Sequence, residues 1–379
     1  MSGFKFICTE CGASYREHEV QLQCPSCARQ QETGGVTRGV LEVVLDELPT
    51  SWPQASPSSA EFLTAFLPLT SPDLLAPIPV GATPLLAAPQ LRHRLGLPQL
   101  WVKDDTRNPS GSTKDRASLL VVAKATEYGY DTVAAASTGN AATALAAIAA
   151  AAGVRAVTFV PHTTPEAKLV QMLNYGAEVI VVDGSYDDAF ELCLKVCKEF
   201  GWYNRNTAIN PFTIEGKKTA ALEVAVQLVP RVPDVFLVPT GDGVILSGVA
   251  KGFSDLASAG LIDRRPRLIA VQPERSASIV TAIEQGASVP SPVPRATSVA
   301  DSLNVQMPRN GLQCLQRIRE SNGGGVKVSD DAIVEAIALL ASTSGVFAEP
   351  SSRGQASKIS LRQAERCINQ LRSQQLSRP

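Results

Sequence analysis

The sequence predicts an α/β fold, in which a mostly parallel sheet carries helices on both faces. From residue 100 onward, short apolar runs alternate with longer segments whose apolar residues recur at helical spacing. Three tight turns, rich in glycine and hydroxyl residues, lie where an apolar run ends or a helical segment begins. Ligands of parallel sheets bind outside the carboxyl ends of the strands. These turns are therefore the expected position of a binding site.

The expected elements of this region are short strands and amphipathic helices in alternation. The strands are expected at residues 100–103, 132–136, 156–160, 178–182, 235–238 and 268–271. The helices are expected at residues 114–128, 141–152, 165–175, 186–199, 214–228 and 244–258.

The region before residue 100 has a different composition. A short apolar run at residues 40–45 predicts one strand. The Pro/Ser-rich stretch at residues 49–59 is typical of a linker, which we expect to keep an N-terminal module independent of the main region. A second proline-rich stretch, at residues 68–84, leads into the main region. The expected parts are a cysteine-containing module at 1–36, a linker and lead-in at 37–80, a main region at 81–350 and an atypical tail at 351–379.

The overall composition is that of a globular protein. The chain has 379 residues, 44% of them hydrophobic, and a formal net charge of −1, and this length is sufficient for two domains with cores. The near-neutral charge gives no electrostatic argument for a nucleic-acid or membrane partner. No secretory signal and no bilayer-spanning run is evident in the sequence, so a cytoplasmic location is expected.

Four of the eight cysteines form two close pairs near the N-terminus. Cys8 and Cys11 form the first pair, Cys24 and Cys27 form the second, and twelve residues separate the pairs. Four thiolates at this spacing can surround Zn²⁺ as a tetrahedron, so we expect a structural zinc ribbon. Two disulfides or unrelated thiols are the alternatives. A further pair at helical spacing is expected to be buried as small apolar residues, namely Cys193 and Cys197.

The most informative segment is the run NPSGSTKDR at residues 108–116. It places Lys114 directly after a Gly/Ser turn and before an apolar run. A lysine at such a loop-to-helix junction, partly withdrawn from water, is a usable amine nucleophile. It suits a Schiff base with pyridoxal 5′-phosphate (PLP), a cofactor that serves as an electron sink. The alternative is a surface lysine at a helix start.

A second turn follows the expected strand at residues 132–136. Ser137, Thr138 and Asn140 lie in this turn, directly before an Ala-rich helical segment. The two hydroxyls and the helix N–H groups suit a carboxylate, and the amide of Asn140 could reach a ring hydroxyl. Capping of the helix is the alternative for Ser137 and Thr138.

A third turn joins an apolar strand to a helix at residues 238–245. Its two glycines allow the backbone to come close to a phosphate. The Asp242 side chain would repel a phosphate and is expected to point away. The backbone N–H groups expected to hold the phosphate are those of Gly241, Asp242, Gly243 and Val244.

The three turns together resemble the motifs of threonine synthases, which belong to the tryptophan-synthase-β (fold type II) group of PLP enzymes. Further matching runs are NRNT at 204–207, NP at 210–211, EGKKT at 215–219 and GVFAEP at 345–350. The resemblance covers roughly residues 81–350. It implies two mostly parallel sheets flanked by helices, with a smaller subdomain at roughly residues 115–205, and a homodimer is a further expectation.

The resemblance also implies an activity, the conversion of O-phospho-L-homoserine and water to L-threonine and phosphate by a lyase of threonine biosynthesis. Lys114 would carry PLP and move protons, and Asn140 would hold the ring hydroxyl. The turn from Gly241 to Val244 would hold the cofactor phosphate. Ser137 and Thr138 would receive the substrate carboxylate.

Two departures from the family pattern affect the substrate and the tail. Thr213 stands where an arginine is expected for the second phosphate. Lys217, Lys218 or Arg205 could supply the positive charge, or they could be solvated surface residues. The Thr-Gly-x-Gly turn that meets the pyridine nitrogen is missing from the C-terminal segment, which is consistent with a divergent, truncated or frameshifted end.

These departures keep two other functions open. A β-replacement synthase or a threonine/serine dehydratase would use the same cofactor on another substrate. A PLP-binding protein with weak catalysis would follow from the altered tail, whose residues after about 353 are expected to pack poorly because their composition is polar and without clear period.

Overall fold

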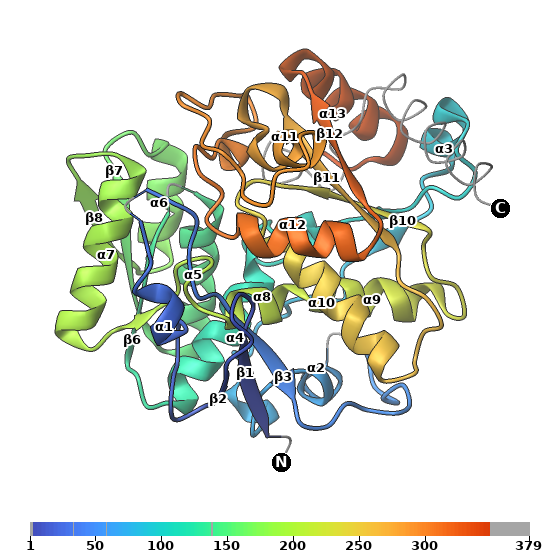
Figure 1. Cartoon of the computed structure of the whole chain (residues 1–379). Helices are drawn as coiled ribbons and strands as arrows, with labels where there is room; N and C mark the ends of the chain where they lie inside the picture. The colour runs from blue at the N-terminus through green and yellow to red at the C-terminus, as the bar shows by residue number, and fades with distance from the viewer. Residues whose placement is uncertain (1–2, 33, 58, 138, 349–379) are drawn as a thin grey trace. The chain divides into compact units, whose positions relative to one another are not determined.

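The computed structural model describes residues 3–32, 34–57, 59–137 and 139–348. These residues form two compact units, each built from separate stretches of chain (Figure 1). Unit 1 contains the described residues up to Thr83 together with Arg107–Pro233 and Ser247–Arg265. Unit 2 contains Pro84–Thr106, Asp234–Leu246 and the described residues from Pro266 onward. The sequence boundaries expected at 36, 80 and 350, and the subdomain at 115–205, stay predictions.

The main sheet of unit 1 is parallel and has the strand order β8-β7-β6-β9. Its strands are β6 (Thr132–Ala136), β7 (Arg155–Pro161), β8 (Glu178–Val182) and β9 (Tyr203–Asn204). Every residue of β6 is buried, as expected for a central strand covered on both faces. The strands predicted at 132–136, 156–160 and 178–182 are confirmed.

Helices cover both faces of this sheet. Its helices are α4 (Lys114–Glu127), α5 (Asn140–Ala152), α6 (Glu166–Asn174), α7 (Tyr186–Phe200), α8 (Phe212–Lys217), α9 (Thr219–Leu228) and, from Ser247 onward, α10 (Val244–Ser258). Phe190 and Cys193 of α7 pack against Ala134 and Phe159 of the sheet. Helices α4 and α5 contact the strands from the other face, where the alternate residues of β6 are also buried.

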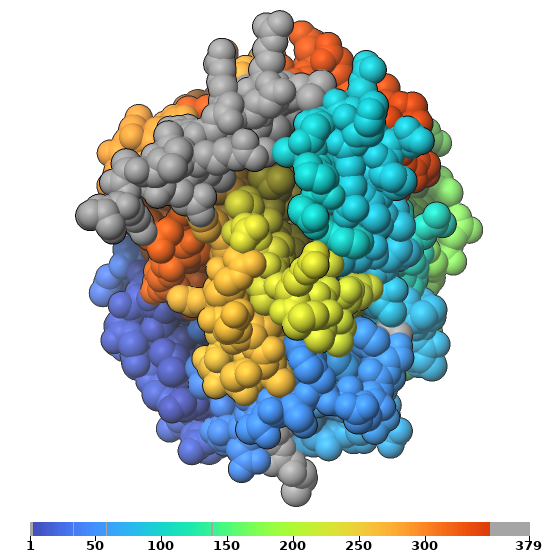
Figure 2. Space-filling view, turned by 90° about the vertical axis from the view of Figure 1, so that its right-hand side faces the viewer, coloured from blue at the N-terminus to red at the C-terminus, as the bar shows by residue number. Residues whose placement is uncertain are grey.

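One helix prediction is wrong in a specific way. The helix expected at 214–228 is two helices, α8 and α9, which meet at Lys218. At this break the chain lies close to α10, since a Cβ on Gly252 would lie 2.6 Å from the Lys218 carbonyl oxygen. Beyond these helices, Arg264 donates to the Val232 carbonyl oxygen at 2.7 Å, and Figure 2 shows the segments after α9 and α10 side by side on the surface.

The N-terminal module is an antiparallel sheet with the strand order β2-β1-β3. Its elements are β1 (Phe4–Cys8), β2 (Ser14–Arg16), α1 (Pro25–Ala28) and β3 (Leu41–Leu45), and α2 (Ala60–Phe66) follows. Strand β3, expected at residues 40–45, pairs with β1 along its whole length. The strand after the cysteine pairs is therefore part of the ribbon sheet.

This module packs directly on the helices of the main sheet. The rings of Phe4 and Phe6 lie 5.9 and 5.7 Å from the ring of Phe212 in α8. Tyr130, after α4, donates to Gln21 at 3.0 Å. The expectation that a proline-rich linker keeps the module independent is wrong, because buried side chains of both parts share one core.

Unit 2 contains a parallel sheet with the order β10-β11-β12 and a short antiparallel pair, β4-β5. Its strands are β4 (Leu85–Leu86), β5 (Val102–Lys103), β10 (Val235–Pro239), β11 (Arg267–Pro273) and β12 (Gly324–Val328). Its helices are α3 (Pro89–Leu95), α11 (Ser278–Glu284), α12 (Gly311–Glu320), α13 (Asp330–Ser344) and the first turn of α10. The strands predicted at 100–103, 235–238 and 268–271 are confirmed, although the first is shorter.

Each unit thus has a parallel sheet flanked by helices, which confirms the predicted fold class. Among the described residues, no helix combines the length and the apolar character that crossing a bilayer requires.

Candidate active site

Lys114 is the first residue of α4, at the point where the Gly/Ser turn ends. Asp115, fully buried, fastens this turn by accepting hydrogen bonds from Ser110 N (2.8 Å) and Ser110 Oγ (2.6 Å). Gly111 has a φ of +77°, a backbone conformation that favours glycine. The turn is therefore held in one shape by the residue next to the lysine. Lys114 itself is half-buried.

A buried ion pair fixes the position of α4 against its neighbours. The Arg116 guanidinium donates to Glu223 of α9 at 2.5 and 3.0 Å, and to Thr83 and Thr219 at 3.0 Å each. Both charged side chains are fully buried. Because breaking such a pair leaves an uncompensated buried charge, the geometry is strongly specified. The ion pair therefore fixes α4 at Arg116, two residues after Lys114.

The second turn leads from β6 into α5. Ser137 N donates to Phe159 O at 3.1 Å, and Ser137 Oγ accepts from Gly139 N at 3.2 Å. Gly139 is the N-cap residue of α5, and no side chain caps this helix. Ser137 therefore stabilises the turn and does not cap the helix. Thr138 lies outside the described residues.

Asn140 is the first residue of α5 and is buried. Its Oδ1 accepts a hydrogen bond from Lys168 Nζ of α6 at 2.8 Å. Ala136, the last residue of β6, donates through its N–H group to Asn206 Oδ1 at 2.7 Å, and this hydrogen bond fixes the end of the strand. The structure thus places Lys114, Ser137 and Asn140 at the starts of two helices, α4 and α5, that pack against one another.

The third turn lies in unit 2, between β10 and α10. Gly243 has a φ of +96°, and a Cβ there would lie 2.6 Å from Cys314 Cβ. Val244 N donates to Asp242 Oδ1 at 3.1 Å. The expectation that the Asp242 side chain points away from the turn is therefore wrong, because its carboxylate accepts from the N–H group that opens the helix. A phosphate at this turn requires that carboxylate to rotate.

The residues of each unit fit parts of a PLP molecule, the cofactor that the three turns predict. Within unit 1, an amine at a helix start and a buried amide lie at the starts of two packed helices. Within unit 2, a glycine turn precedes a helix N-terminus, which suits a phosphate. Beside Lys114, Thr113 Oγ1 is buried without a hydrogen-bond partner among the described residues. A buried hydroxyl of this kind is rare in folded proteins unless a ligand or water satisfies it.

The cations considered for a second phosphate are all buried, so the alternative that they are solvated surface residues is wrong. Lys218 forms ion pairs with Glu215 and, at 2.8 Å, with Asp255. Arg205 donates to Ser118 and Thr207. Burial opposes the ionisation of Asp255, yet Lys218 and Lys251 hold its pKa below the ordinary value. Lys218 is therefore committed to an internal network.

Lys217 and Thr213 differ from Lys218 in their surroundings. Thr213 Oγ1 donates to the Asn210 carbonyl oxygen at 2.7 Å, so this hydroxyl closes its own helical turn. Lys217 is buried in α8, and a Cβ on Gly248 of α10 would lie 2.7 Å from Lys217 Cβ. The stem of Lys217 thus packs closely against α10.

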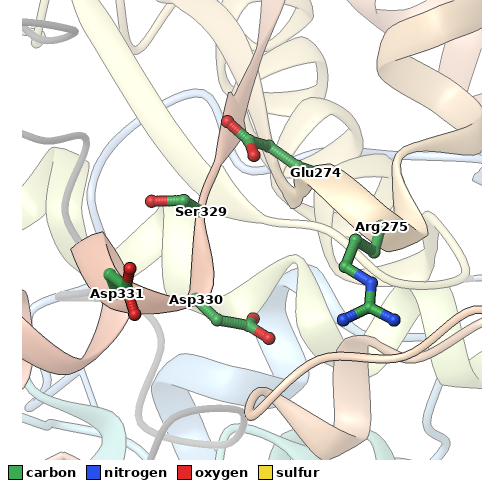
Figure 3. A pocket seen from close by; sticks show the side chains of 5 residues that line it. All are labelled: Glu274, Arg275, Ser329, Asp330 and Asp331. Carbon is green, nitrogen blue, oxygen red and sulfur yellow. The ribbon is translucent and has the colours of Figure 1, made fainter.

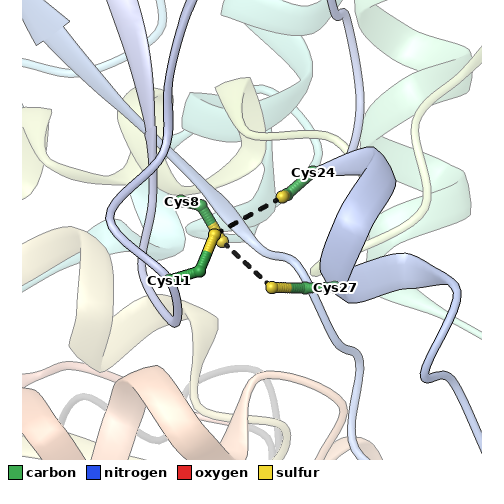
Figure 4. A group of neighbouring side chains, drawn as sticks. All are labelled: Cys8, Cys11, Cys24 and Cys27. Atoms are coloured by element: carbon green, nitrogen blue, oxygen red, sulfur yellow. Dashed lines mark hydrogen bonds between the residues drawn. The ribbon is translucent and has the colours of Figure 1, made fainter.

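The four N-terminal cysteines form one cluster (Figure 4). Their sulfur atoms all lie within 4.8 Å of one another, and the Cys8–Cys27 and Cys11–Cys24 distances are both 3.8 Å. All four are free thiols, which rules out the disulfide alternative in this structure. A zinc ion with Zn–S bonds of about 2.3 Å has S···S separations of about 3.8 Å. The cluster has the size of a Cys₄ metal site.

A tyrosine hydroxyl adjoins this cluster. Tyr15 OH lies 3.1 Å from Cys24 Sγ. Desolvation acts against ionisation of Cys24, but hydrogen bonds from Tyr15 and from the backbone lower its pKa to about 6. The thiolate form, which binds metals, is thereby favoured.

Cys193 and Cys197 are buried in the core of unit 1, as predicted. Asn204 Nδ2 donates to both sulfur atoms, at 3.7 and 3.4 Å. This pair therefore belongs to the packing of α7 on the sheet.

A small pocket of about 180 Å³ lies in unit 2 (Figure 3). Its lining residues follow the carboxyl ends of β11 and β12, and they are Glu274, Arg275, Ser329, Asp330 and Asp331. Three carboxylates and one guanidinium make it acidic. This pocket was not predicted from the sequence, although polar residues directly after buried strands are the signal that could have located it.

Comparisons with known proteins identify the family. The model of a family described as "Pyridoxal-phosphate dependent enzyme" matches residues 77–366. This match extends past residue 350, where the sequence motifs end. A threonine synthase of Methanosarcina acetivorans is 35% identical, over 91% of this chain and 83% of that protein. One of Synechocystis sp. is 35% identical over 80% of each chain. Among solved structures, a threonine deaminase of T.th. has a TM-score of 0.64 at 26% identity, covering 75% of this chain and 88% of its own.

A maize serine racemase has a similar fold, with a TM-score of 0.62 at 27% identity, and the match covers 73% of this chain and 80% of the racemase. These structures are PLP-type folds of the same architecture, whereas the threonine synthases match over more of the sequence. The chain therefore belongs to the pyridoxal-phosphate dependent enzymes of fold type II and, among them, to the threonine synthase family.

Proposed function

We propose that this chain converts O-phospho-L-homoserine and water to L-threonine and phosphate. The similarity to threonine synthases over 91% of the chain supports the substrate. The observation that carries the chemistry is the position of Lys114, at the head of a buried helix and directly after a turn that Asp115 fastens. A fixed amine at that place can exchange protons with a bound amino acid.

The residues of unit 1 then have separate tasks. PLP, when bound, withdraws electrons from the carbon chain of the substrate. The Lys114 amine takes a proton from the substrate and returns it after phosphate has left and water has been added. The Asn140 amide donates to the ring hydroxyl of the cofactor. The Ser137 hydroxyl and the N–H groups at the start of α5 receive the substrate carboxylate.

Two further groups would hold the phosphates. The N–H groups of Gly241, Asp242, Gly243 and Val244 suit the cofactor phosphate once the Asp242 carboxylate turns away from Val244 N. For the second phosphate, on the substrate, we propose Lys217, a buried cation of α8, since Lys218 forms ion pairs with Glu215 and Asp255 that it would have to give up.

The test has two independent parts. Borohydride reduction of the PLP-loaded protein, followed by peptide mapping, should locate the cofactor on Lys114, and Lys114→Ala should abolish the labelling. Phosphate release should then be measured with O-phosphohomoserine and with O-phosphoserine. Labelling of Lys114 without phosphate release from O-phosphohomoserine would contradict the substrate and leave the cofactor site standing.

A dehydratase is the second candidate, and one observation favours it. Thr213, in place of the expected arginine, uses its hydroxyl within its own turn, so the cation for a second phosphate must come from elsewhere. Threonine and serine carry no phosphate. Formation of a keto acid from either amino acid, in place of phosphate release, would support this function.

The third function weighed above, a PLP-binding protein with weak catalysis, depends on the tail. That tail lies outside the described residues, and so do Ser351 and Ser352, the nearest candidates in the sequence for the pyridine-nitrogen contact. Turnover of the whole chain, compared with that of a related threonine synthase, decides this alternative.

We also propose that Cys8, Cys11, Cys24 and Cys27 hold one structural Zn²⁺. The sulfur separations of 3.8 Å and the hydrogen bond to Cys24 support this assignment. Metal analysis of protein purified without chelator should find one zinc per chain, and Cys24→Ser should lose it.

Two broader expectations follow from this chemistry. Free thiols in a metal-sized cluster fit a reducing compartment, so we propose a cytoplasmic location. We further propose a homodimer that acts on a small amino-acid substrate, with no nucleic-acid or membrane partner. Sedimentation analysis of the PLP-loaded protein tests the assembly.

A further inference from the structure

Lys168 is a site-adjacent residue that none of the three motif turns contains. It lies in α6, a helix that packs against α5, and its Nζ donates to Asn140 Oδ1 at 2.8 Å. Asn140 is buried and starts α5, and Lys168 is half-buried. An ammonium group thus approaches the second turn from outside the sequence motifs.

The chemistry of the two groups settles the orientation of the amide. A lysine ammonium has three donors and no acceptor, whereas an asparagine side chain has an accepting oxygen and a donating nitrogen. The amide oxygen must therefore face Lys168, and the NH₂ group lies on the other side of the amide. A charged donor on the oxygen also polarises the amide and makes its N–H groups stronger donors.

Within the described part of the chain, this hydrogen bond is the one polar contact of Lys168. No described carboxylate lies within ion-pair distance of its ammonium, so its positive charge is not neutralised locally. Lysines on half-exposed helix faces usually extend into solvent. A lysine that instead reaches a buried amide acts on that amide.

We propose that Lys168 is a positioning residue for the cofactor, which holds the Asn140 amide with its NH₂ group toward the ring hydroxyl of PLP. The inference rests on the function proposed above, and specifically on the task of Asn140. Without Lys168 the amide can flip and present its oxygen to the ring oxygen, which repels it. The cation also favours the ionised form of that hydroxyl through the polarised amide.

The test compares three variants by titration of cofactor-free protein with PLP, read by the absorbance spectrum. Lys168→Met should weaken PLP binding about tenfold and change the spectrum of the bound cofactor, because a charge-assisted hydrogen bond is lost. Lys168→Arg keeps a cationic donor, so its PLP affinity and its cofactor spectrum should both stay close to those of the unaltered protein. Lys198→Met, at an exposed lysine of α7, is the matched control and should bind as the unaltered protein does.

A second step separates positioning from a purely structural contact. Asn140→Asp keeps an acceptor for Lys168 but removes the donor, so it should alter the spectrum while the far-UV circular dichroism is unchanged. In that background, Lys168→Met should cause little further loss of PLP affinity. The proposal is overturned if Lys168→Met leaves the PLP affinity and the spectrum unchanged. It is also overturned if the losses of PLP affinity from Lys168→Met and Asn140→Asp add in full in the double variant. Neither result depends on turnover of O-phosphohomoserine, so failure of the substrate assignment shows separately in the phosphate assay.

Discussion

The ammonium of Lys124, near the end of α4, lies 4.9 Å from the centre of the Phe4 ring in β1. The same ammonium lies 4.5 Å from the Tyr128 ring and 5.2 Å from the Phe212 ring, and it pairs with Glu17 at 2.6 Å. A cation–π contact of a desolvated lysine contributes about 2 kcal/mol or more. The helix that begins with Lys114 is therefore attached at its far end to the cysteine module.

This attachment makes metal removal consequential for the catalytic region. Zinc release should loosen β1 and so remove packing from α4 and α8. We expect chelation, or Cys24→Ser, to lower Tm by several degrees, since loss of a structural zinc removes several kcal/mol and each kcal/mol corresponds to roughly 1–2 °C in a chain of this length. Scanning calorimetry with and without chelator measures this effect.

His18→Ala is the control, because His18 is exposed between the cysteine pairs. It should keep both zinc and Tm. A chelated protein that retains its Tm and PLP affinity would show that the module is dispensable to the rest of the unit.

A second prediction concerns acid stability, through Glu127. Burial acts to raise the pKa of this carboxyl, but Lys124 and Thr70 hold it below the ordinary 4.5. A group whose pKa is lower in the folded state contributes stability above its unfolded pKa and loses it as pH falls through the folded value. Below about pH 4.5, the unaltered protein should therefore lose stability more steeply than Glu127→Gln.

Urea unfolding at a series of pH values between neutral and acid measures this difference. Glu199→Gln, at the exposed end of α7, is the control. Parallel curves for Glu127→Gln and the unaltered protein would mean that the carboxyl does not report on the Lys124 contact.

Local features of this fold were predictable from the sequence, and contacts between distant segments were not. The residues that form the turn before Lys114 are consecutive in the sequence. The Gly/Ser turn, the lysine and the apolar run after it therefore predict a loop-to-helix junction. Strand β12 was missed, because its glycine pair, Gly324 and Gly325, lowers strand propensity and only pairing with β11 makes it a strand. The break at Lys218 was missed because the apolar pattern of residues 214–228 continues through it; in the structure Lys218 lies against Gly252 of α10.

The candidate site shows the same limit. Asn140 follows from the motif, but Lys168 lies 28 positions away on another helix and has no motif of its own. Docking of Phe4 and Phe6 on Phe212 likewise depends on the fold. Alternating apolar residues in β1 predict a buried face and do not identify its partner.

The adjacent lysines of α8 provide a third prediction. Lys218→Ala should cost about 3–5 kcal/mol of unfolding free energy, because Glu215 and Asp255 lose a buried partner. Lys217→Ala should instead raise KM for O-phosphohomoserine about tenfold and leave PLP affinity nearly unchanged. Urea unfolding, steady-state kinetics and PLP titration of both variants provide the comparison.

Lys198→Ala is the matched control for the loss of a lysine at an exposed position. An unchanged KM in Lys217→Ala would remove this lysine from the substrate site and strengthen the dehydratase alternative.

The last prediction concerns the glycine turn of unit 2. Gly243→Ala should be costly for two separable reasons. The φ of +96° strains any side chain by roughly 1–2 kcal/mol, and a Cβ 2.6 Å from Cys314 Cβ adds an overpacking cost of about 1–3 kcal/mol. Gly176→Ala isolates the first cost, because Gly176 has a φ of +82° and nothing within 4 Å of the added Cβ. In urea unfolding, Gly243→Ala should therefore have a lower free energy of unfolding than Gly176→Ala. PLP titration should show weaker binding only for Gly243→Ala. Equal PLP affinity in the two variants would mean that the turn from Gly241 to Val244 does not hold the cofactor phosphate.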